Sequence, residues 1–266
     1  MTSIVSSAEQ KKLMAFASGL ALGAGTILRS GFHKRLAVTY KGRINPVTDL
    51  DLKSERHIVN AIRRRYPDHD ILAEEGSRGG DRSEFRWIID PLDGTVNYAH
   101  GFPVYCVSIG LEYRGKVLLG VVYDPERNEL FHAIAKRGAF MDRDRIYVSS
   151  ERRLERALLA TGFAYDIATA RKNNLGLFAR MAKRAQGVRR PGSAAIDICW
   201  LASGRVDGFW ELKLHPWDTA AAVLVLIEAG GRATRINGSE YSIFDPDMLA
   251  SNGHLHRVMS HVLNGR

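Results

Sequence analysis

The chain has 266 residues, of which 45% are hydrophobic and 25% charged, a composition that is ordinary for a globular protein. Its length fits one large domain or two lobes that share a core. Cys106 and Cys199 lie far apart in apolar runs and form no CxxC pair, which argues against zinc and favours a reduced, cytoplasmic compartment.

The net charge of +9 is compatible with a nucleic-acid or membrane-surface partner. The Lys and Arg residues are scattered in short groups such as Arg63-Arg64-Arg65, however, and such groups usually form a solvated surface. We therefore interpret the charge as compositional, and we keep an RNA- or protein-binding regulator as an alternative function.

The first predicted element is a helix that contains the apolar run of residues 13–28. Ser6 and Glu9 have the spacing of a capping box, which predicts where this helix starts. The run is shorter than a membrane span requires and ends at Arg29. We interpret it as a buried helix rather than an export signal, and we expect no membrane partner.

The next predicted elements are a helix, a short strand, a Gly- and Arg-rich loop and an apolar strand. The helix is opened by a second capping box, Thr48 with Asp51, and stops at Tyr66-Pro67. The loop is the expected mobile lid of a site. The strand, the loop and the second strand cover residues 70–75, 76–85 and 86–90 in turn.

The order of predicted strands and helices changes further along the chain. Alternating strand and turn signals over residues 103–148 predict an antiparallel meander. Beyond about residue 150, strands are expected at 157–163 and 205–212, and helices at 173–185, 193–204, 216–231 and 254–263. Helices that cover sheets on more than one side predict a layered α/β body. The change in composition near residue 150 predicts an N-terminal lobe, residues 1–150, and a C-terminal lobe, residues 151–266, with the active site between them.

Acidic residues stand at the ends of predicted elements. The run WIIDPLDGTVNY, residues 87–98, places Asp90 and Asp93 directly after an apolar strand. Asp-Pro and Asp-Gly are common turn dipeptides, which explains the backbone but not why two acids stand there. Carboxylates crowded at the end of a buried strand repel one another, and a divalent cation would remove that repulsion.

Two more acids extend this set. Glu74 ends the preceding strand, and Asp218 opens a helix, where it would also complement the helix dipole. Four acids with no His or Cys among them favour Mg²⁺ or Mn²⁺ over zinc. Gly94 and Thr95 follow directly and could offer amides to a phosphate. Metal ligands beside such amides suit metal-assisted hydrolysis of a phosphate ester.

The run WIIDPLDGTVNY together with HPWDTAAAVLVLIEAGG, residues 215–231, resembles the two signatures of the inositol monophosphatase family. These are magnesium-dependent, lithium-sensitive sugar phosphatases. The resemblance covers nearly the whole chain, including ILAEEG and GSAAIDICWLASGRVDGFWE. It implies the layered sugar phosphatase fold, a homodimer, and Mg²⁺-dependent release of phosphate from inositol 1-phosphate or a related sugar or polyol phosphate.

The resemblance also implies the metal ligands. It assigns a first ion to Glu74, Asp90 and the backbone carbonyl of Leu92. It assigns a second ion to Asp90, Asp93 and Asp218. Glu74 would also help to hold a third, weaker ion, so that two or three ions are expected.

Catalytic and substrate-binding residues follow from the same resemblance. Thr95 and Glu74 would orient the attacking water, with Asp51 hydrogen-bonded to Thr95. Lys41 matches a basic residue near the phosphate, and His215 is expected to have a supporting role. Substrate contacts are implied for Asp93, Gly94, Thr95, Gly192, Ser193, Ala194 and Glu211.

Other substrates stay open at this point. Fructose-1,6-bisphosphatase, histidinol-phosphate phosphatase and adenosine 3′,5′-bisphosphate nucleotidase activities occur on the same scaffold. The run Val96-Asn97-Tyr98 after the DGT motif is similar to the inositol monophosphatase branch, and Glu211 favours a polyol. The intact acid set argues against a purely non-enzymatic role.

Overall fold

The computed structural model describes residues 5–32, 38–41, 45–76, 78–79 and 83–265, and for 38–41, 45–48 and 78–79 it describes the backbone only. The helices are α1 (Ser7–Gly31), α2 (Asp49–Arg65), α3 (Thr95–Ala99), α4 (Leu175–Ala182), α5 (Ala194–Ala202), α6 (Pro216–Glu228) and α7 (His256–Leu263), with a 3-10 turn η1 (Leu154–Arg156).

Most strands belong to two sheets. The first has the order β10-β9-β8-β7-β6-β5-β3-β4 and the second the order β12-β11-β13-β15-β14. The first contains β3 (Asp70–Ala73), β4 (Arg78–Gly79), β5 (Phe85–Asp93), β6 (Cys106–Tyr113), β7 (Lys116–Asp124), β8 (Glu129–Ile134), β9 (Ala139–Met141) and β10 (Asp144–Arg145). The second contains β11 (Leu158–Thr161), β12 (Gly187–Arg189), β13 (Gly208–Leu212), β14 (Arg232–Thr234) and β15 (Asp247–Ser251). A separate hairpin pairs β1 (Val38–Lys41) with β2 (Asn45–Thr48).

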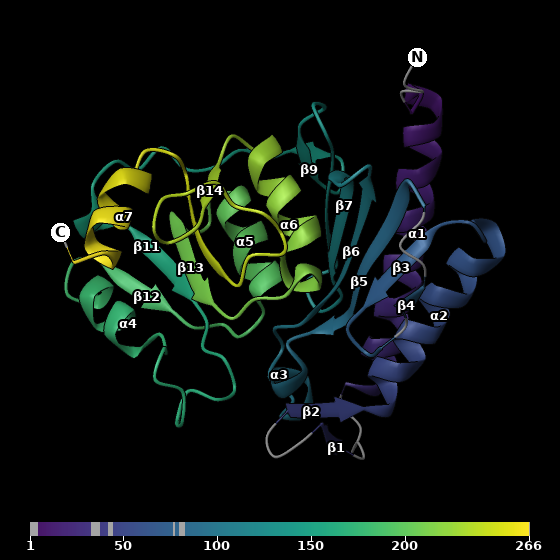
Figure 1. The fold of residues 1–266 in the computed structure, drawn as a ribbon, viewed down its shortest axis with the longest axis horizontal. Coiled ribbons are helices and arrows are strands. Elements are labelled where there is room, and N and C mark those ends of the chain that lie inside the picture. Colours follow the sequence, from purple (N-terminus) through teal and green to yellow (C-terminus); the bar gives the residue numbers. More distant parts are fainter. Residues whose placement is uncertain (1–4, 33–37, 42–44, 77, 80–82, 266) are drawn as a thin grey trace.

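Helices and sheets alternate in layers across the molecule (Figure 1). Helices α1 and α2 cover the outer face of the first sheet, and α5 and α6 lie between the two sheets. Helices α4 and α7 cover the outer face of the second sheet. The predicted layered α/β fold is therefore confirmed, and each apolar sheet face is covered by the apolar side of a helix.

The antiparallel meander predicted over residues 103–148 is also confirmed. Strands β6 to β10 pair antiparallel with their neighbours in chain order, as alternating strand and turn signals indicate. Several short strands were not predicted, among them β1, β2, β14 and β15. Every residue of β15 is buried, so the segment shows no alternation of polar and apolar residues that would mark it as a strand.

Helix α1 packs as a core helix. Ser6 Oγ accepts a hydrogen bond from the backbone N–H of Glu9, as the capping box predicts. Among the described helices, α1 has the length and apolar composition that could cross a membrane. Its face formed by Leu13, Leu20 and Leu28 is buried in the cluster that joins α1, α2 and the first sheet. The predicted helix is thus found, and one face of it is buried in the core.

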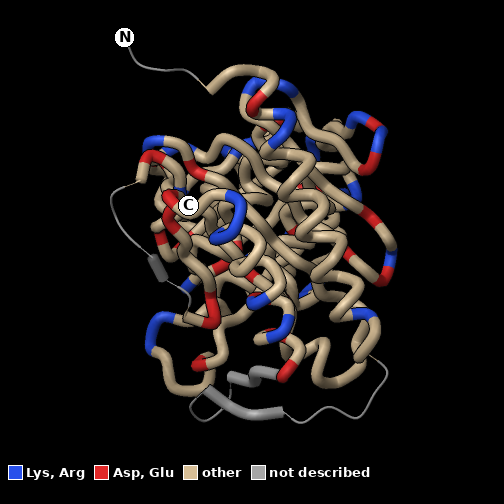
Figure 2. The backbone as a smooth tube through the Cα atoms, turned by 90° about the vertical axis from the view of Figure 1, so that its right-hand side faces the viewer, with Lys and Arg blue, Asp and Glu red and all other residues tan. Residues whose placement is uncertain are grey.

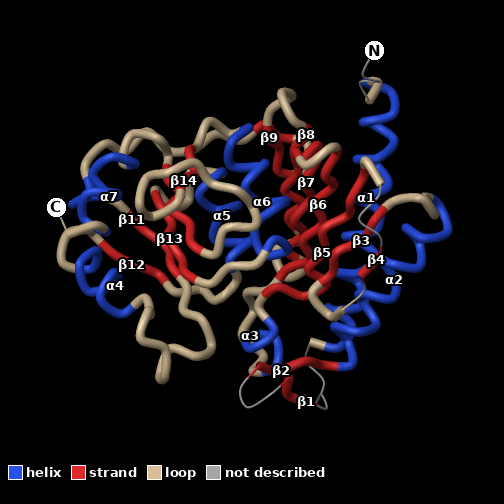
Figure 3. Tube along the Cα trace, in the orientation of Figure 1, coloured by secondary structure: helices blue, strands red, loops and turns tan. Residues whose placement is uncertain are grey.

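The two sheets are separated by layers of helix (Figure 3). The first sheet ends at Arg145 and the second begins at Leu158. Helix α6 comes late in the chain yet packs on β6 and β7 of the first sheet. One hydrophobic cluster accordingly joins residues from both halves of the chain. The boundary between lobes near residue 150 stays a prediction.

Residues of both charges alternate along the backbone. In Figure 2, segments with Lys and Arg are interspersed with segments that carry Asp and Glu. Arg63, Arg64 and Arg65 form the exposed last turn of α2, where cations complement the carbonyl ends of a helix. This group therefore has a structural explanation that does not require a nucleic acid.

The close approach of α6 to the first sheet gives a testable prediction at Gly120. A Cβ atom at Gly120 would lie 2.5 Å from the carbonyl oxygen and 2.7 Å from the Cα of Ala221, which is backbone that cannot rotate away. We expect Gly120→Ala to lower the free energy of unfolding by about 1–3 kcal/mol, measured by urea denaturation.

Gly19 in α1 is the matched control. A Cβ atom there would meet nothing within 4 Å, and Gly19 lies on the exposed side of the helix. Gly19→Ala should raise the free energy of unfolding by about 0.5–1 kcal/mol, because alanine is the better helix former. Equal effects of the two substitutions would contradict the packing of α6 described above.

Candidate active site

A cavity of about 520 Å³ opens where β3 and β5 end and α5 and α6 begin. The predicted site residues that line it are Glu74, Asp90, Leu92, Asp93, Gly94, Thr95, Gly192, Ser193, Ala194, Glu211, His215 and Asp218. Asp51 lies behind the cavity wall, buried on α2. Residues that are far apart in the chain therefore come together around one cavity.

An irregularity in β5 places Asp90 and Asp93 on the same face of the sheet. Asp90 lies opposite Ser108 of β6, and Asp93 lies opposite Cys106. The two acids are three residues apart, but their partners are only two apart, so β5 contains one extra residue. In a regular strand, residues three apart face opposite sides, and the extra residue cancels that alternation.

This irregularity corrects one prediction. The apolar strand was expected to end at Asp90 and to be followed by a tight turn. Strand β5 instead continues to Asp93, and the turn into α3 comes at Gly94, which has a φ of 95°. Both acids are thereby held by strand pairing rather than by a loop.

Glu74 reaches the cavity from the turn that directly follows the neighbouring strand, because β3 ends at Ala73 and not, as predicted, at residue 75. Strands β3 and β5 are parallel, with Ala73 opposite Ile89, so Glu74 and Asp90 follow at the same level. The backbone N–H of Glu74 donates to the carbonyl of Ile89 at 3.2 Å. The carboxyl ends of two parallel strands thus deliver two acids to one edge of the sheet.

Asp93 also ties β5 to the start of α5. Its Oδ2 accepts hydrogen bonds from Ser193 Oγ at 2.7 Å and from the backbone N–H of Ala195 at 2.8 Å. The first turn of a helix carries backbone N–H groups that favour a carboxylate. One carboxyl group therefore joins residues that are 100 positions apart in the chain.

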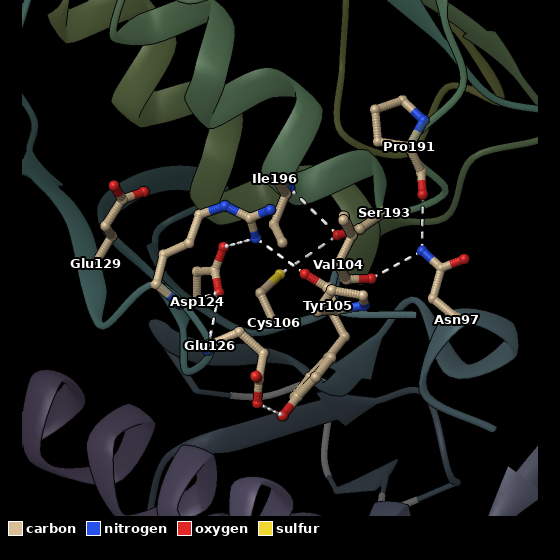
Figure 4. A network of polar contacts seen from close by, with 12 residues as sticks. Asn97, Val104, Tyr105, Cys106, Asp124, Glu126, Glu129, Pro191, Ser193 and Ile196 are labelled. Atoms are coloured by element: carbon tan, nitrogen blue, oxygen red, sulfur yellow. Dashed lines mark hydrogen bonds and ion pairs between the residues drawn. The ribbon is translucent and has the colours of Figure 1, made fainter. Parts of the chain in front are cut away.

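Asn97 makes a second link between the halves of the chain (Figure 4). Its Nδ2 donates to the carbonyl of Val104 at 2.8 Å and to the carbonyl of Pro191 at 2.7 Å. Pro191 directly precedes Gly192 and Ser193 of the cavity wall. The two links fix this wall against the turn that carries Gly94 and Thr95.

Helix α2 supports the same turn from behind. The hydroxyl of Thr95 lies 3.4 Å from Asp51 Oδ1 and 3.1 Å from the carbonyl oxygen of Leu92. A hydroxyl has one hydrogen, so Thr95 can donate to only one of these acceptors at a time. Ser54 Oγ, one turn further along α2, donates to the carbonyl of Pro91 at 2.8 Å.

Asp218 comes from the first turn of α6. Its Oδ2 accepts the backbone N–H of His215 at 2.7 Å, so it caps its own helix while it lines the cavity. The ring of His215 stacks on that of Trp217, with centroids 4.8 Å apart. His215 thus contributes to the shape of the cavity mouth.

The electrostatics of the cavity are unfavourable for the acids alone. Burial raises the pKa of Asp90 well above its ordinary value, and the charges of Glu74, Asp93 and Asp218 raise it further. Burial raises the pKa of Asp218 as well, and the charge of Asp93 adds to the effect. Burial also raises the pKa of Asp93, although the hydrogen bond from Ser193 lowers it in part. A bound cation would relieve this repulsion.

The donor set fits a hard cation. Among the described residues, no three His, Cys, Asp or Glu side chains are already drawn together into an ion cage. The fit therefore rests on chemistry: the cavity offers carboxylate oxygens and the Leu92 carbonyl. His215 also lines it, with its ring stacked on that of Trp217, and no Cys is among the described residues that line it. Oxygen ligands of this kind are those that Mg²⁺ and Mn²⁺ prefer.

Two predictions concern residues that the structure describes only in part. The backbone of Lys41 lies in β1, and its side chain falls outside the description. The proposed lid, residues 76–85, includes positions 77 and 80–82, which also fall outside the described residues. The role of Lys41 and the lid both stay predictions.

Several residues that line the cavity were not predicted, and three of them bear on its chemistry. Asp197 of α5 is buried, Arg190 comes from the segment before Gly192, and Tyr165 comes from the loop after β11. Asp197 carried a signal, because it is the only charged residue in the apolar run SAAIDICWL. The other two lie in loops whose position depends on the tertiary structure.

Glu211 gives a prediction for the pH dependence of stability. Burial, together with the charge of Asp93, raises its pKa to about 8, although Arg190 opposes this. The folded state therefore keeps a proton that the unfolded state has lost, so stability falls as the pH rises from about 4.5, the ordinary pKa of Glu, towards 8.

The measurement is thermal unfolding of the metal-free protein. Glu211→Gln cannot titrate, so its melting temperature should exceed that of the wild type by more at pH 8 than at pH 5. A difference that does not change with pH would contradict the raised pKa of Glu211.

Comparisons with known proteins identify the family of this chain. A sequence model of the inositol monophosphatase family matches residues 9–264. The inositol-1-monophosphatase of Synechocystis sp. is 42% identical, over 98% of this chain and 91% of its own. A protein named Nus factor SuhB from Pasteurella multocida is 38% identical, over 91% of this chain and 90% of its own.

A solved structure supports the same family. The inositol monophosphatase from Anabaena (Nostoc) sp. has a TM-score of 0.87 at 41% identity, and the match covers 96% of each chain. The chain therefore belongs to the inositol monophosphatase family, and it is a phosphatase of that type.

Proposed function

We propose that this enzyme releases inorganic phosphate from inositol 1-phosphate, or from a related polyol or sugar phosphate, in a Mg²⁺-dependent hydrolysis. The observation that carries this proposal is the single cavity at which Glu74, Asp90, Asp93 and Asp218 meet. Glu74 directly follows β3, the other three acids lie in β5 and α6, and all four stand beside the turn at Gly94. A phosphate could not approach them unless their charge were neutralised.

The acids divide into two sets of ligands. Glu74, Asp90 and the carbonyl of Leu92 would hold one Mg²⁺, and Asp90, Asp93 and Asp218 would hold a second. Glu74 would also contribute to a third, weaker ion, and Mn²⁺ would suit the same oxygens. When bound, the ions supply Lewis-acid chemistry that neutralises the phosphate and acidifies a bound water.

Thr95 and Glu74 orient the attacking water in this proposal. If the Thr95 hydroxyl donates its hydrogen to Asp51, its oxygen can accept a hydrogen bond from the water. The water oxygen bonds to phosphorus, the ester P–O bond breaks, and the alcohol leaves with a proton. Asp51 therefore acts through Thr95 rather than on the substrate.

The substrate is held by two parts of the cavity. The backbone amides of Gly94 and Thr95 bind the phosphate, with Asp93 beside them. Gly192, Ser193 and Ala194 form the wall that meets the hydroxyl groups of the polyol. Glu211 faces the same space and accepts hydrogen bonds from those hydroxyl groups.

The test is a phosphate-release screen with the purified enzyme. We expect turnover of inositol 1-phosphate with Mg²⁺, loss of turnover when the metal is chelated, and inhibition by lithium. Fructose 1,6-bisphosphate, histidinol phosphate and adenosine 3′,5′-bisphosphate complete the panel, because these activities occur on the same scaffold. Preference for one of these three would replace the proposed substrate, and metal-independent turnover would refute the mechanism.

Further properties follow from the family and are proposed with it. We expect a cytoplasmic homodimer, which light scattering of the purified protein would test. The relative named Nus factor SuhB keeps an interaction with RNA or protein as an alternative role for the basic surface. Salt-dependent retention on heparin, compared between wild type and a variant of Arg63, Arg64 and Arg65, distinguishes that role.

A further inference from the structure

One carboxyl group in the cavity has no use in the proposed reaction. Asp197 lies in the first half of α5, and its side chain is 1% exposed. Its Oδ1 has no hydrogen-bond partner among the described residues. Among all the residues that the structure describes, three buried side-chain atoms share that property, and Asp197 is the one whose residue lines the cavity.

A buried carboxyl oxygen without a partner lowers the stability of a protein. The cost of leaving such a group unsatisfied is about 1–3 kcal/mol or more. An apolar residue would continue the pattern of the helix, whose neighbouring residues Ile196, Ile198 and Cys199 are buried. A polar group that is kept at such a cost points to a ligand that supplies the missing hydrogen bond.

The surroundings of Asp197 indicate what that ligand is. Glu211 and Arg190 line the same cavity, and both act electrostatically on Asp197. Burial raises the pKa of Asp197 well above its ordinary value, and the charge of Glu211 raises it further. Burial favours the uncharged form of both acids, and Arg190 already brings a positive charge to them, so this end of the cavity suits a neutral hydroxyl group better than a cationic ammonium group.

We propose that Asp197 is a specificity-determining residue whose Oδ1 hydrogen-bonds a hydroxyl group of the substrate beside Glu211. This inference deepens the proposed function and rests on it. A hydroxyl group can both donate and accept, so it satisfies Asp197 whether that carboxyl is ionised or protonated. The ligand class is a ring or chain that carries hydroxyl groups next to its phosphate, and a phosphate ester without hydroxyl groups leaves Asp197 unpaired.

The experiment compares two substrates that differ only in their hydroxyl groups. Inositol 1-phosphate and cyclohexyl phosphate share a six-membered ring and a phosphate. Asp197→Ala should lower kcat/KM for inositol 1-phosphate by roughly three- to tenfold, the value of one hydrogen bond to an uncharged group. Its kcat/KM for cyclohexyl phosphate should change by less than about twofold.

Asp197→Asn keeps the size of the side chain and one acceptor oxygen. It should recover part of the activity toward inositol 1-phosphate that Asp197→Ala loses. Without substrate, Asp197→Asn should melt at a higher temperature than the wild type, because a buried carboxyl is replaced by a neutral amide. A residue with a purely structural role would instead melt at a lower temperature.

Asp207 provides the matched control. It is a buried acid outside the cavity, and it accepts hydrogen bonds from Ser149 Oγ and from the backbone N–H of Leu158. Asp207→Asn should lower the melting temperature and leave the ratio of the two kcat/KM values unchanged. This control shows how general destabilisation affects the assay.

The outcomes separate this inference from the function on which it rests. Equal losses on the two substrates in Asp197→Ala, with a wild type that turns over inositol 1-phosphate, would overturn the role of Asp197 alone. A wild type without phosphatase activity toward either substrate would overturn both proposals. Selective loss on inositol 1-phosphate, with the higher melting temperature of Asp197→Asn, supports the assignment.

Discussion

Asp90→Asn is expected to abolish phosphate release while the fold is retained. Asp90 is 1% exposed and lies where Glu74, Asp93 and Asp218 act on it. It is the acid that both proposed ions share, so an amide in its place removes a charge from each ligand set. We expect kcat to fall on the order of 10³-fold or more, because the charge that develops in the transition state loses its stabilisation.

The same substitution has an opposite effect on stability. Without divalent cations, four acids repel one another around the cavity, and Asp90→Asn removes one of them. The melting temperature of the metal-free variant should therefore exceed that of the wild type. Added Mg²⁺ should raise the melting temperature of the wild type, since a ligand that binds only the folded state stabilises it. This shift should be much smaller in the variant.

Asp124 is the control for Asp90. It is equally buried, but its carboxylate accepts hydrogen bonds from the side chain of Arg127 and from the backbone N–H of Glu126. Asp124→Asn should therefore lower the melting temperature and leave Mg²⁺-dependent turnover in the folded fraction. Full activity of Asp90→Asn at modest Mg²⁺ would count decisively against the proposed metal site.

The second large effect is expected at Gly94, where β5 turns into α3. Its φ of 95° lies in the left-handed region. A Cβ atom there would lie 2.8 Å from the carbonyl oxygen of Val104 and 3.3 Å from the Cα of Tyr105. We expect Gly94→Ala to lower the free energy of unfolding by about 2–4 kcal/mol, from conformational strain and steric overlap together. Turnover should fall as well, because Asp93 and Thr95 flank the strained turn.

A substitution at Gly101 separates the cost of conformational strain from that of steric overlap. Its φ is 69°, and a Cβ atom there would meet nothing within 4 Å. Gly101→Ala should therefore show the conformational cost alone, about 1–2 kcal/mol, and keep its activity. Urea denaturation gives the stabilities, and the phosphate-release assay gives the activities. If Gly94→Ala were no more destabilising than Gly101→Ala, the close contact with Val104 would be disproved.

Local signals in the sequence determine much of this protein. Capping residues such as Ser6 and Glu9 act over one helical turn, so the start of α1 could be predicted without knowledge of the rest. The alternation in residues 103–148 is likewise a local pattern, and it predicted the meander. The acids of the DPLDGT run and Asp218 stood out because carboxylates at the ends of apolar elements are chemically unusual.

Only the tertiary structure decided how these residues meet. The extra residue in β5 is identified when Asp90 and Asp93 are paired with Ser108 and Cys106 of the neighbouring strand. The short strand β15 forms because β13 and β14 flank it on both sides. In the sequence, Asp197 is only a single acid in an apolar helix. The packing of α5 is what brings it close to Glu211. Long-range pairing and burial set these features, and they depend on residues that are distant in the chain.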